Sequence, residues 1–316
     1  MENNTEPQAR QNTRRLAHPR LGVVTVTYNS QSVFPEFLDS VLRQTYPDFI
    51  LYIVDNASTD GTQRSIAEIA DARVRVHCSP ENLGFAAGTN LGMKMALEEG
   101  CDTLMLLNND TVFGPEMFQQ LVDGLDQYDC DMTTPKMLYY DPPNKIWAAG
   151  GHLNKWLGYR NQHDGENQLD DGRFDSPRKI TFTPFCCIVM RRSVVEKLGY
   201  LDERYFVYTE DADYCFRAMQ SRLSIWYVPQ AKLWHKVSSL TGHMSDFMVR
   251  YCTRNRIYFL RKLLSDFQAK SWYGIYHIHY AVAFLSGKNS RDRWRLRRTS
   301  AGEGWRMQPA TRHRKE

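Results

Sequence analysis

A repeated pattern of apolar strand followed by amphipathic helix most limits how this chain can fold. "LGVVTVTYNS" from Leu21 predicts a buried strand that ends in turn residues, and "FPEFLDSVLRQ" follows with apolar residues at helical spacing. The same unit returns at "FILYIVDNASTDGT", "VRVHCSPENLGFAAGTNLGMKMALEEG" and "CDTLMLLNNDTVFGPEMFQQLVDGL". Strands that alternate with helices of this length predict an α/β fold with a mostly parallel, doubly wound sheet.

Polar residues collect where these predicted strands end. In doubly wound sheets, ligands bind beyond the carboxyl ends of the strands, near the point where strand order reverses. The sequence therefore predicts one binding site at this edge of the sheet. The residues concerned are Tyr28, Asn29, Asp55, Asn56, Asn82, Asn108, Asn109 and Asp110.

Composition narrows the class of protein. The chain has 316 residues, of which 42% are hydrophobic, so it can bury a sizeable core. The net charge is only +4, and residues 288–316 contain ten Lys or Arg and three acids. The rest of the chain is therefore nearly balanced in charge, and we do not expect it to form a nucleic-acid-binding surface. Seven cysteines without a C-x-x-C pair predict reduced, buried thiols in a cytoplasmic protein. The polar N-terminus predicts no secretory signal, and no apolar run reaches a membrane span.

The alternation stops after about residue 135. Residues 136–180 are rich in Gly, Asn, Asp and aromatic residues, which predicts an irregular excursion or short hairpins. "TFTPFCCIVMRRSVVEKLG" then predicts a strand and a short helix that ends at Gly199. We expect one continuous domain, because these later segments add chemistry and no independent core.

Asp110 ends the apolar run "LMLLNNDT", and two interpretations are open. An Asn-Asn-Asp turn can simply end a strand, or the carboxylate can bind a divalent cation when substrate phosphates supply further ligands. His235, after the strand-like "SIWYVPQAKLW", would favour Mn²⁺ over Mg²⁺ if it reached the same ion. The alternative for His235 is a hydrogen-bonded packing residue.

A helix is predicted to begin at Thr209, with acids in its first turn. Helical spacing puts Asp211 in the apolar arc and puts Glu210, Asp213 and Arg217 on the opposite side, so Asp211 is the expected inward acid. Burial would raise the pKa of Asp211 toward that of a general base, whereas the helix N-terminus would lower it. The alternative is that these acids only cap the helix.

Six motifs in one order resemble the inverting family 2 glycosyltransferases, which have the GT-A nucleotide-diphospho-sugar transferase fold. They are "VVTVTYNS", "YIVDNASTDGT", "NLGFAAGTN", "LLNNDT", "LDERYFVYTEDADYCFR" and "WH". The resemblance covers residues 21–264, which we expect to form the glycosyltransferase domain. The polar residues 1–20 predict a flexible arm, and residues 265–316 predict a C-terminal helical extension with an apolar segment and a basic tail. The sequences of these motifs are most similar to those of the rhamnosyltransferase-like branch of the family.

The resemblance also implies roles for individual residues. Asp211, paired with Glu210, matches the catalytic base, while Asp110 and His235 match metal ligands. Asp55 matches the acid that reads the nucleobase. Asn at position 108 departs from the family's D-x-D motif. The remaining residues that match the nucleotide-sugar site are Thr27, Tyr28, Asn29, Asn56, Asn82, Gly88, Asn90, Asn108 and Asn109.

The implied activity is transfer of a sugar, rhamnose from dTDP-rhamnose being the best single guess, onto a glycan or lipid-linked acceptor with a divalent metal (Mn²⁺ or Mg²⁺). Such enzymes build surface polysaccharide, and we expect a cytoplasmic protein whose C-terminal segment contacts the inner face of the plasma membrane; a solvated tail is the alternative. A non-catalytic sugar-nucleotide-binding relative is a second hypothesis. A nucleotidyltransferase is a third, but the first strand is followed by "TYNSQSVF" and lacks the expected Gly-rich loop with Arg and Lys.

Overall fold

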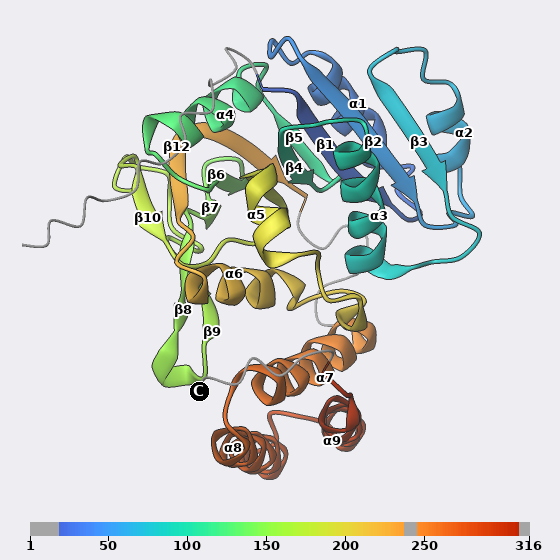
Figure 1. Cartoon of the computed structure of the whole chain (residues 1–316). Helices are drawn as coiled ribbons and strands as arrows, with labels where there is room; N and C mark the ends of the chain where they lie inside the picture. The colour runs from blue at the N-terminus through green and yellow to red at the C-terminus, as the bar shows by residue number, and fades with distance from the viewer. Residues whose placement is uncertain (1–18, 237–244, 310–316) are drawn as a thin grey trace, which may run out of the picture.

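The computed structural model describes residues 19–236 and 245–309. Within them, ten strands form one sheet in the order β10-β12-β6-β11-β4-β1-β2-β3, with β5 paired to β12 and β7 to β6. Figure 1 shows this sheet with helices on both faces. The strands are β1 (Leu21–Thr27), β2 (Phe49–Asp55), β3 (Val74–Cys78), β4 (Thr103–Leu107), β5 (Thr111–Phe113), β6 (Met132–Tyr139), β7 (Ile146–Ala148), β10 (Arg178–Ile180), β11 (Cys187–Arg191) and β12 (Ile225–His235).

The first half of the chain forms the predicted parallel unit. β1 pairs in parallel with β2 and β4, and β2 pairs in parallel with β3. Strand order reverses between β1 and β4, so the carboxyl ends of both strands border the crevice where doubly wound sheets bind ligands. The helices of this half are α1 (Phe34–Leu42), α2 (Thr62–Ala67), α3 (Gly84–Glu98) and α4 (Met117–Gln127).

Successive side chains of the central strands enter two different cores. In β4, Leu104 and Leu106 pack with α3, α5 (Arg192–Leu198) and α6 (Glu210–Gln220), whereas Met105 and Leu107 pack with α1 and α4. Because both faces are covered, the strand is buried at every position, and its residues after Thr103 are all apolar with no alternation of polar residues. This is why "TLMLL" reads as a continuous apolar run.

The second half of the sheet is mixed. β11 lies antiparallel between β4 and β6, and the long β12 runs parallel to β6. The excursion over residues 136–180 forms short strands, as predicted, including the separate hairpin of β8 (Gly151–Asn154) and β9 (Arg160–His163). This hairpin projects from the sheet toward the C-terminal helices (Figure 1).

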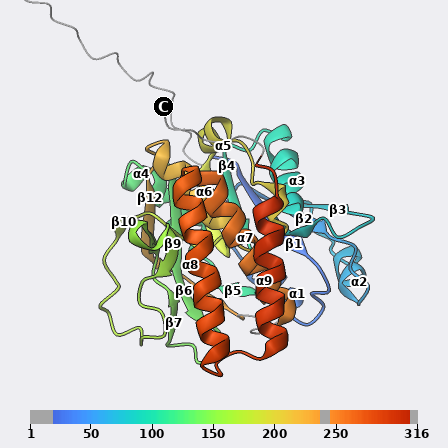
Figure 2. The same cartoon turned by 90° about the horizontal axis from the view of Figure 1, so that it is seen from below.

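Three helices follow the sheet: α7 (Asp246–Leu263), α8 (Asp266–Leu285) and α9 (Arg291–Arg306). Seen from below, α8 and α9 lie side by side beneath α7 (Figure 2). The described part of the expected basic tail is therefore the helix α9, not a solvated tail, because its aromatic residues pack on α8. The predicted arm lies outside the described residues except for Pro19 and Arg20, as do residues 310–316.

Two further expectations can be compared with the fold. The seven cysteines are free thiols, and five are buried; Cys78 is exposed and Cys252 is half-buried, so the prediction of buried thiols is wrong for those two. Among the described residues, no helix has both the length and the apolar character needed to cross a bilayer.

Candidate active site

The carboxyl ends of β1 and β2 meet at Asp55, which is fully buried. Its Oδ1 accepts hydrogen bonds from the Thr27 hydroxyl (2.8 Å) and the Ser58 hydroxyl (2.5 Å). Its Oδ2 accepts from the Ser58 backbone N–H (3.0 Å) and the Gln63 amide (2.8 Å). Thr27 and Asp55 are register partners in the sheet, which brings the two side chains together. Gln63 is exposed, so its amide is the one partner that a ligand can displace without opening the core.

Tyr28 and Asn29 follow β1 and differ in what they do. Asn29 is left-handed (φ 50°), a conformation that Asn tolerates better than most residues, and its Oδ1 accepts from the Thr59 backbone N–H at 2.8 Å. Asn29 therefore ties the loop after β1 to the loop after β2. Tyr28 is 46% exposed, so its ring is available to stack on a planar ligand such as a nucleobase.

Three predicted residues, Asn56, Asn82 and Gly88, lie around the start of α3. Asn82 Oδ1 accepts from the Gly84 N–H at 2.9 Å, and Asn56 Nδ2 donates to the Gly84 carbonyl at 3.0 Å. Gly88 is buried, and a Cβ there would lie 3.1 Å from Val26 and 3.2 Å from Asn56. The glycine thus permits close packing of α3 on the strand ends. Asn56 Oδ1 is buried and has no hydrogen-bond partner among the described residues.

Asn90 has a different place from the one expected. Its amide donates to the Leu201 carbonyl (3.0 Å) and to Glu203 Oε1 (2.9 Å), and its Oδ1 accepts from the Leu201 N–H (2.9 Å). The side chain is buried and all its polar atoms are used. Asn90 therefore joins α3 to residues 201–203 and does not face the strand-end crevice.

The three residues of "NND", which follow β4, differ in their burial and contacts. Asn109 is buried and donates to the Val26 carbonyl (2.8 Å) and the Ser30 hydroxyl (3.1 Å), which fixes the end of β4 to the end of β1. Asn108 is half-buried, and its backbone N–H donates to the Cys186 carbonyl at 2.9 Å. Asp110 is 8% exposed and begins the turn into β5.

Antiparallel pairing of β5 with β12 brings His235 to Asp110. His235 pairs with Thr111, and the Lys236 N–H donates to the Asp110 carbonyl at 2.9 Å. As a result, His235 Nε2 lies 3.2 Å from Asp110 Oδ1. The Trp147 ring packs edge-on against the imidazole at 4.5 Å and limits its rotation. Residues 125 positions apart in the chain thus form one buried pair.

This pair fits a divalent cation. Asp110 Oδ1 has no hydrogen-bond partner in the described part of the chain, because its 3.2 Å contact with His235 Nε2 lacks hydrogen-bond geometry, and His235 Nδ1 has no partner there either. An unpaired buried carboxylate oxygen costs free energy unless a cation or proton compensates it. Carboxylate and imidazole are both ligands of Mn²⁺. No group of three His, Cys, Asp or Glu side chains with metal-binding geometry occurs among the described residues, so further ligands would come from substrate or water.

The acid pair opens α6, but its burial differs from the helical-arc prediction. Thr209 precedes the helix in a left-handed conformation (φ 77°), and its side chain makes no capping hydrogen bond. Glu210 and Asp213 are buried, whereas Asp211 is half-buried. The prediction that Asp211 alone points inward is therefore wrong, because α6 is covered on several sides by α5, α7 and the sheet.

The two carboxyl groups differ in their proton affinity. Burial raises the pKa of Glu210 well above its usual value, and the adjacent charge of Asp211 adds to the rise. Burial also raises the pKa of Asp211, to about 6, although the N–H groups of Ala212 and Phe185 oppose it. Of the two carboxyl groups, Asp211 therefore gives up its proton the more readily. Asp211 is also the more accessible of the two, as a general base must be.

The segment over residues 183–187 connects the two halves of the site. The Cys186 carbonyl accepts from the Asn108 N–H, and burial raises the pKa of the Cys186 thiol, with the nearby Asp110 carboxylate adding to the rise. The next residue toward the N-terminus, Phe185, offers its N–H to Asp211. The Asp110–His235 pair and the Asp211 carboxylate therefore border the same short stretch of backbone.

Sequence reasoning missed the residues that hold the acid pair in place. Phe206, Tyr208 and Thr209 all have positive φ, which is strained for residues other than glycine. The amide of Asn255 on α7, fully buried, lies within hydrogen-bond distance of the carbonyls of Tyr205 (2.9 Å), Val207 (2.7 Å) and Tyr208 (2.7 Å). An Asn inside the aromatic helix segment "YCTRNRIYFL" was the available signal.

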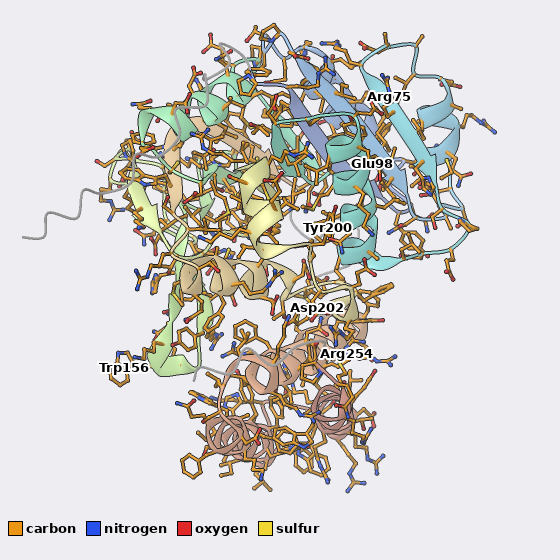
Figure 3. All side chains as sticks on the ribbon, in the orientation of Figure 1. Arg75, Glu98, Trp156, Tyr200, Asp202 and Arg254 are labelled. Carbon is orange, nitrogen blue, oxygen red and sulfur yellow. The ribbon has the colours of Figure 1, made fainter. Side chains whose placement is uncertain are left out.

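Arg254 supports the same loop from the neighbouring position on α7. Its Nη2 donates to the carbonyls of Arg204 (2.9 Å) and Tyr205 (2.7 Å), and its Nε donates to Asn255 Oδ1 (2.8 Å). Figure 3 shows Arg254 and Asp202 where the C-terminal helices meet the body of the molecule. We call Arg254 and Asn255 the α7 clamp.

Comparison with known proteins agrees with this geometry. The family model described as "Glycosyl transferase family 2" matches residues 22–199, more than half of the chain. The matched range includes the strand-end residues and Asp110 and ends before the acid pair. Two curated relatives are N-acetylglucosaminyl-diphospho-decaprenol L-rhamnosyltransferase of Mycobacterium tuberculosis, 27% identical over 70% of this chain and 78% of its own, and dTDP-rhamnosyl transferase RfbF of Shigella flexneri, 22% identical over 76% and 79%.

Solved structures show the same fold. GalNAc-T7 with UDP, GalNAc and Mn²⁺ superposes with a TM-score of 0.62 at 14% identity, over 90% of this chain and 55% of that one. S. aureus TarS 1–349 in complex with UDP-GlcNAc superposes with a TM-score of 0.56 at 16% identity, over 90% and 80%. At these identities the likeness concerns the fold alone, and it confirms the predicted GT-A architecture.

Proposed function

The chain belongs to glycosyl transferase family 2, and from this premise we propose that it is an inverting, metal-dependent transferase of a nucleotide-activated sugar. The single observation that supports this most is the position of Asp211, a carboxylate with a pKa of about 6, beside the backbone segment that also borders the Asp110–His235 pair. A base and a charge-neutralising site that border one stretch of backbone suit a group transfer between an acceptor hydroxyl and a leaving phosphate.

Asp211 is the proposed general base. In a single displacement it takes the proton of the acceptor hydroxyl, and that oxygen attacks the anomeric carbon while the bond to the diphosphate breaks. One attack from the face opposite the leaving group inverts the anomeric centre. Glu210 is buried beside Asp211 with its pKa raised well above the usual value, and we assign it no direct contact with the substrate.

Asp110 and His235 are the proposed cation ligands. A divalent cation bound there supplies positive charge that stabilises the departing nucleoside diphosphate. Trp147 keeps the imidazole facing Asp110, and Asn109 keeps the end of β4 against β1. The neutral Asn108 leaves Asp110 as the carboxylate of this motif, so the pair should need the donor phosphates to complete the coordination.

The nucleoside is proposed to lie over the ends of β1 and β2. Tyr28 offers an exposed ring for stacking, and Asp55 can accept an N–H of the base if the Gln63 amide leaves its Oδ2. Thr27, Asn29 and Asn56 shape this edge, and Asn82 and Gly88 position α3 beside it. Asn90 acts at a distance, through residues 201–203.

The donor and acceptor are narrower proposals. Two relatives carry rhamnosyltransferase names, and one of those names includes dTDP, so dTDP-rhamnose is the donor that we propose first. The other name specifies a diphospho-decaprenol acceptor, which supports a hydroxyl of a glycan or lipid-linked glycan in surface polysaccharide synthesis. We place the reaction in the cytoplasm, at the inner face of the plasma membrane, with contact through the C-terminal segment.

One experiment tests the core of this function. The full chain is incubated with Mn²⁺ and a panel of nucleotide sugars, and binding is measured by the shift of melting temperature and by calorimetry. We expect dTDP-rhamnose to bind in a Mn²⁺-dependent way, and proton NMR of a transferred product to show the inverted anomer. Retention of the anomeric configuration, or donor binding that EDTA leaves unchanged, would contradict the proposal.

A further inference from the structure

The outward face of α8 carries a stripe of exposed apolar side chains. Phe267 and Leu285 are each 81% exposed, and Ile278 is 66% exposed. Ile275 and Val282, at 50% and 57%, complete the stripe. Their spacing of three, four, seven and eight residues places all five within one narrow arc of the helix. We call them the α8 stripe.

This stripe is unusual for a helix that faces water. The 20 residues of α8 include only two charged side chains, Asp266 and Lys270, and neither falls within the arc of the stripe. Surface helices normally turn charged residues outward, and an exposed contiguous apolar patch marks a contact site. The α8 stripe therefore needs a partner.

The other face of α8 is already packed, so a rotation of the helix would not hide the stripe. Phe284 stacks on Trp294 of α9 at 5.2 Å, and Tyr273 contacts Trp305 of α9 at 4.7 Å. Tyr280 is buried beneath the Arg297 guanidinium. The helix is thus apolar on both sides, and only one side is covered within the described residues.

Positive charge accompanies the stripe on the neighbouring helix. α9 lies beside α8 on the underside of the molecule (Figure 2), and Arg291, Arg295 and Arg298 are exposed at positions i, i+4 and i+7 of one α9 face. From residue 266 to residue 309 the chain has eight Lys or Arg and three acids. An apolar stripe beside an arginine row matches the surface of an anionic bilayer.

The tip of the β8–β9 hairpin extends the same side of the molecule. Arg256 of α7 donates to the carbonyls of Leu157 (2.8 Å) and Gly158 (2.6 Å), which fixes the tip beside the C-terminal helices. Trp156 at this tip is 88% exposed and points away from the body (Figure 3). Indole rings favour the boundary between lipid headgroups and acyl chains.

We propose that the α8 stripe and the α9 arginines form a docking surface for a bilayer that contains anionic lipids. α8 lies in the plane of the interface and does not span it. A second copy of the chain is a poorer partner, because face-to-face packing would bring two arginine rows together. The role of this surface rests on the proposed function, since it would hold the site near lipid-linked acceptors; the binding itself does not.

Sedimentation of the full chain with vesicles tests the docking surface. We expect binding to phosphatidylcholine vesicles that contain phosphatidylglycerol, and weak binding to vesicles of phosphatidylcholine alone. Arg291→Gln, Arg295→Gln and Arg298→Gln together should weaken binding on the order of a hundredfold at low salt, because each arginine near an anionic surface contributes about fivefold. Ile278→Glu with Val282→Glu should weaken it at least about tenfold, whatever the salt.

Val76→Glu with Leu169→Glu is the matched control. These residues are 43% and 58% exposed and lie in β3 and in the 136–180 excursion, away from α8. The control should bind vesicles like the parent chain, and both double variants should keep the parent melting temperature. Equal binding by the α8 variant and the parent would overturn the proposal, as would concentration-dependent dimerisation that the α8 variant abolishes, or absence of binding to either vesicle.

Sugar transfer to a water-soluble acceptor tests the proposed chemistry independently of the docking surface. The α8 and α9 variants should retain parent activity on that acceptor in the absence of vesicles, because no stripe residue touches the catalytic site. Vesicle binding by a chain without transferase activity would contradict the proposed function alone. Transfer without vesicle binding would contradict the docking surface alone.

Discussion

At the scale of single residues, the acid pair makes the most direct prediction. Because Asp211 must be ionised to accept a proton and its pKa is about 6, kcat/KM should fall about tenfold per pH unit below that value and level off above pH 7. Asp211→Asn should lower turnover by at least about a hundredfold with donor binding unchanged. Glu210→Gln is the comparison, because it removes the neighbouring titratable group and leaves Asp211 in place. A parent profile without an acid limb near pH 6 would remove Asp211 from the role of base.

The same carboxylate should lower stability at neutral pH. The pKa of Asp211 is raised from 3.8 to about 6, so the stability of the folded state is full below pH 4 and is lost as pH rises through 6. Asp211→Asn removes this dependence, and its free energy of unfolding at pH 8 should exceed that of the parent by about 3 kcal/mol. Urea unfolding at pH 4 and pH 8 measures the difference. The exposed acid Glu68 provides a control as Glu68→Gln, which should show no such pH-dependent gain.

The Asp110–His235 pair can be tested by a binding measurement that does not depend on catalytic turnover. Mn²⁺ binding in the presence of a nucleoside diphosphate, measured by calorimetry, should weaken in Asp110→Asn and in His235→Gln. Each loss should exceed the roughly tenfold cost of removing an outer contact, for which Trp147→Leu is the comparison. If His235→Gln binds Mn²⁺ like the parent, the imidazole is a packing residue and Asp110 acts without it.

The positions of several candidate residues could be predicted from sequence because they depend on local order, while their roles stay predictions. Asp55 ends β2, Asp110 lies between β4 and β5, and Asp211 is in the first turn of α6, as the local patterns indicated. Asn90 could not be placed in this way, because its partners Leu201 and Glu203 are over a hundred positions away. Ser58 and Gln63 were missed for a related reason: their hydrogen bonds to Asp55 depend on how the loop after β2 folds back.

At the scale of elements, the α7 clamp determines how α6 presents its acids. Asn255→Ala removes the amide that bonds three carbonyls of a loop with three strained residues. The free energy of unfolding should fall by about 2–4 kcal/mol, and kcat should fall while donor KM stays constant. As Asn255 is a positioning residue, the acid limb of the pH profile should also move, because Asp211 loses its fixed environment.

Val249→Ala on the same helix provides the control for the clamp. Val249 is buried on α7 and makes no contact with the strained loop that we describe, so its truncation should lower stability without moving the acid limb. An unchanged pH profile in Asn255→Ala, together with a kcat like that of Val249→Ala, would reduce the clamp to a purely structural contact.

Elements built from local patterns were predicted better than those built from distant pairing. Strands β1, β2 and β4 and the helices that follow them could be predicted from hydrophobic patterns, because both faces of these strands are buried. The β5–β12 pairing that delivers His235 has no local signal. The sequence of α9 also did not predict a packed helix. Its Trp294 and Trp305 pack against aromatic residues of α8, and this contact between two helices has no local sequence signal.

At the scale of the whole molecule, a buried ion network joins the C-terminal helices to the body. Lys262 of α7 lies 2.8 Å from both Asp202 and Asp213, and Asp213 also accepts from Arg217 at 2.9 Å. Burial acts to raise the pKa of Asp202, but the nearby Lys262 charge and several hydrogen bonds outweigh it, and the pKa falls to about 2. Asp202 therefore contributes its ion pair with Lys262 to the junction of α6, α7 and residues 202–205 only while it is ionised.

Acid should loosen this junction in a defined window. The pKa of Asp202 is lowered from 3.8 to about 2, so its contribution to stability is present above pH 4 and is lost as pH falls toward 2; it amounts to about 2 kcal/mol. Lys262→Met should cost about 3–5 kcal/mol at pH 7, because two buried carboxylates lose their cation, and should also reduce the loss between pH 4 and pH 2. Urea unfolding across that range measures both. If Lys262→Met unfolds in one transition, α7 folds together with the sheet; loss of α7 to α9 in a separate, earlier transition would show that the network alone couples them.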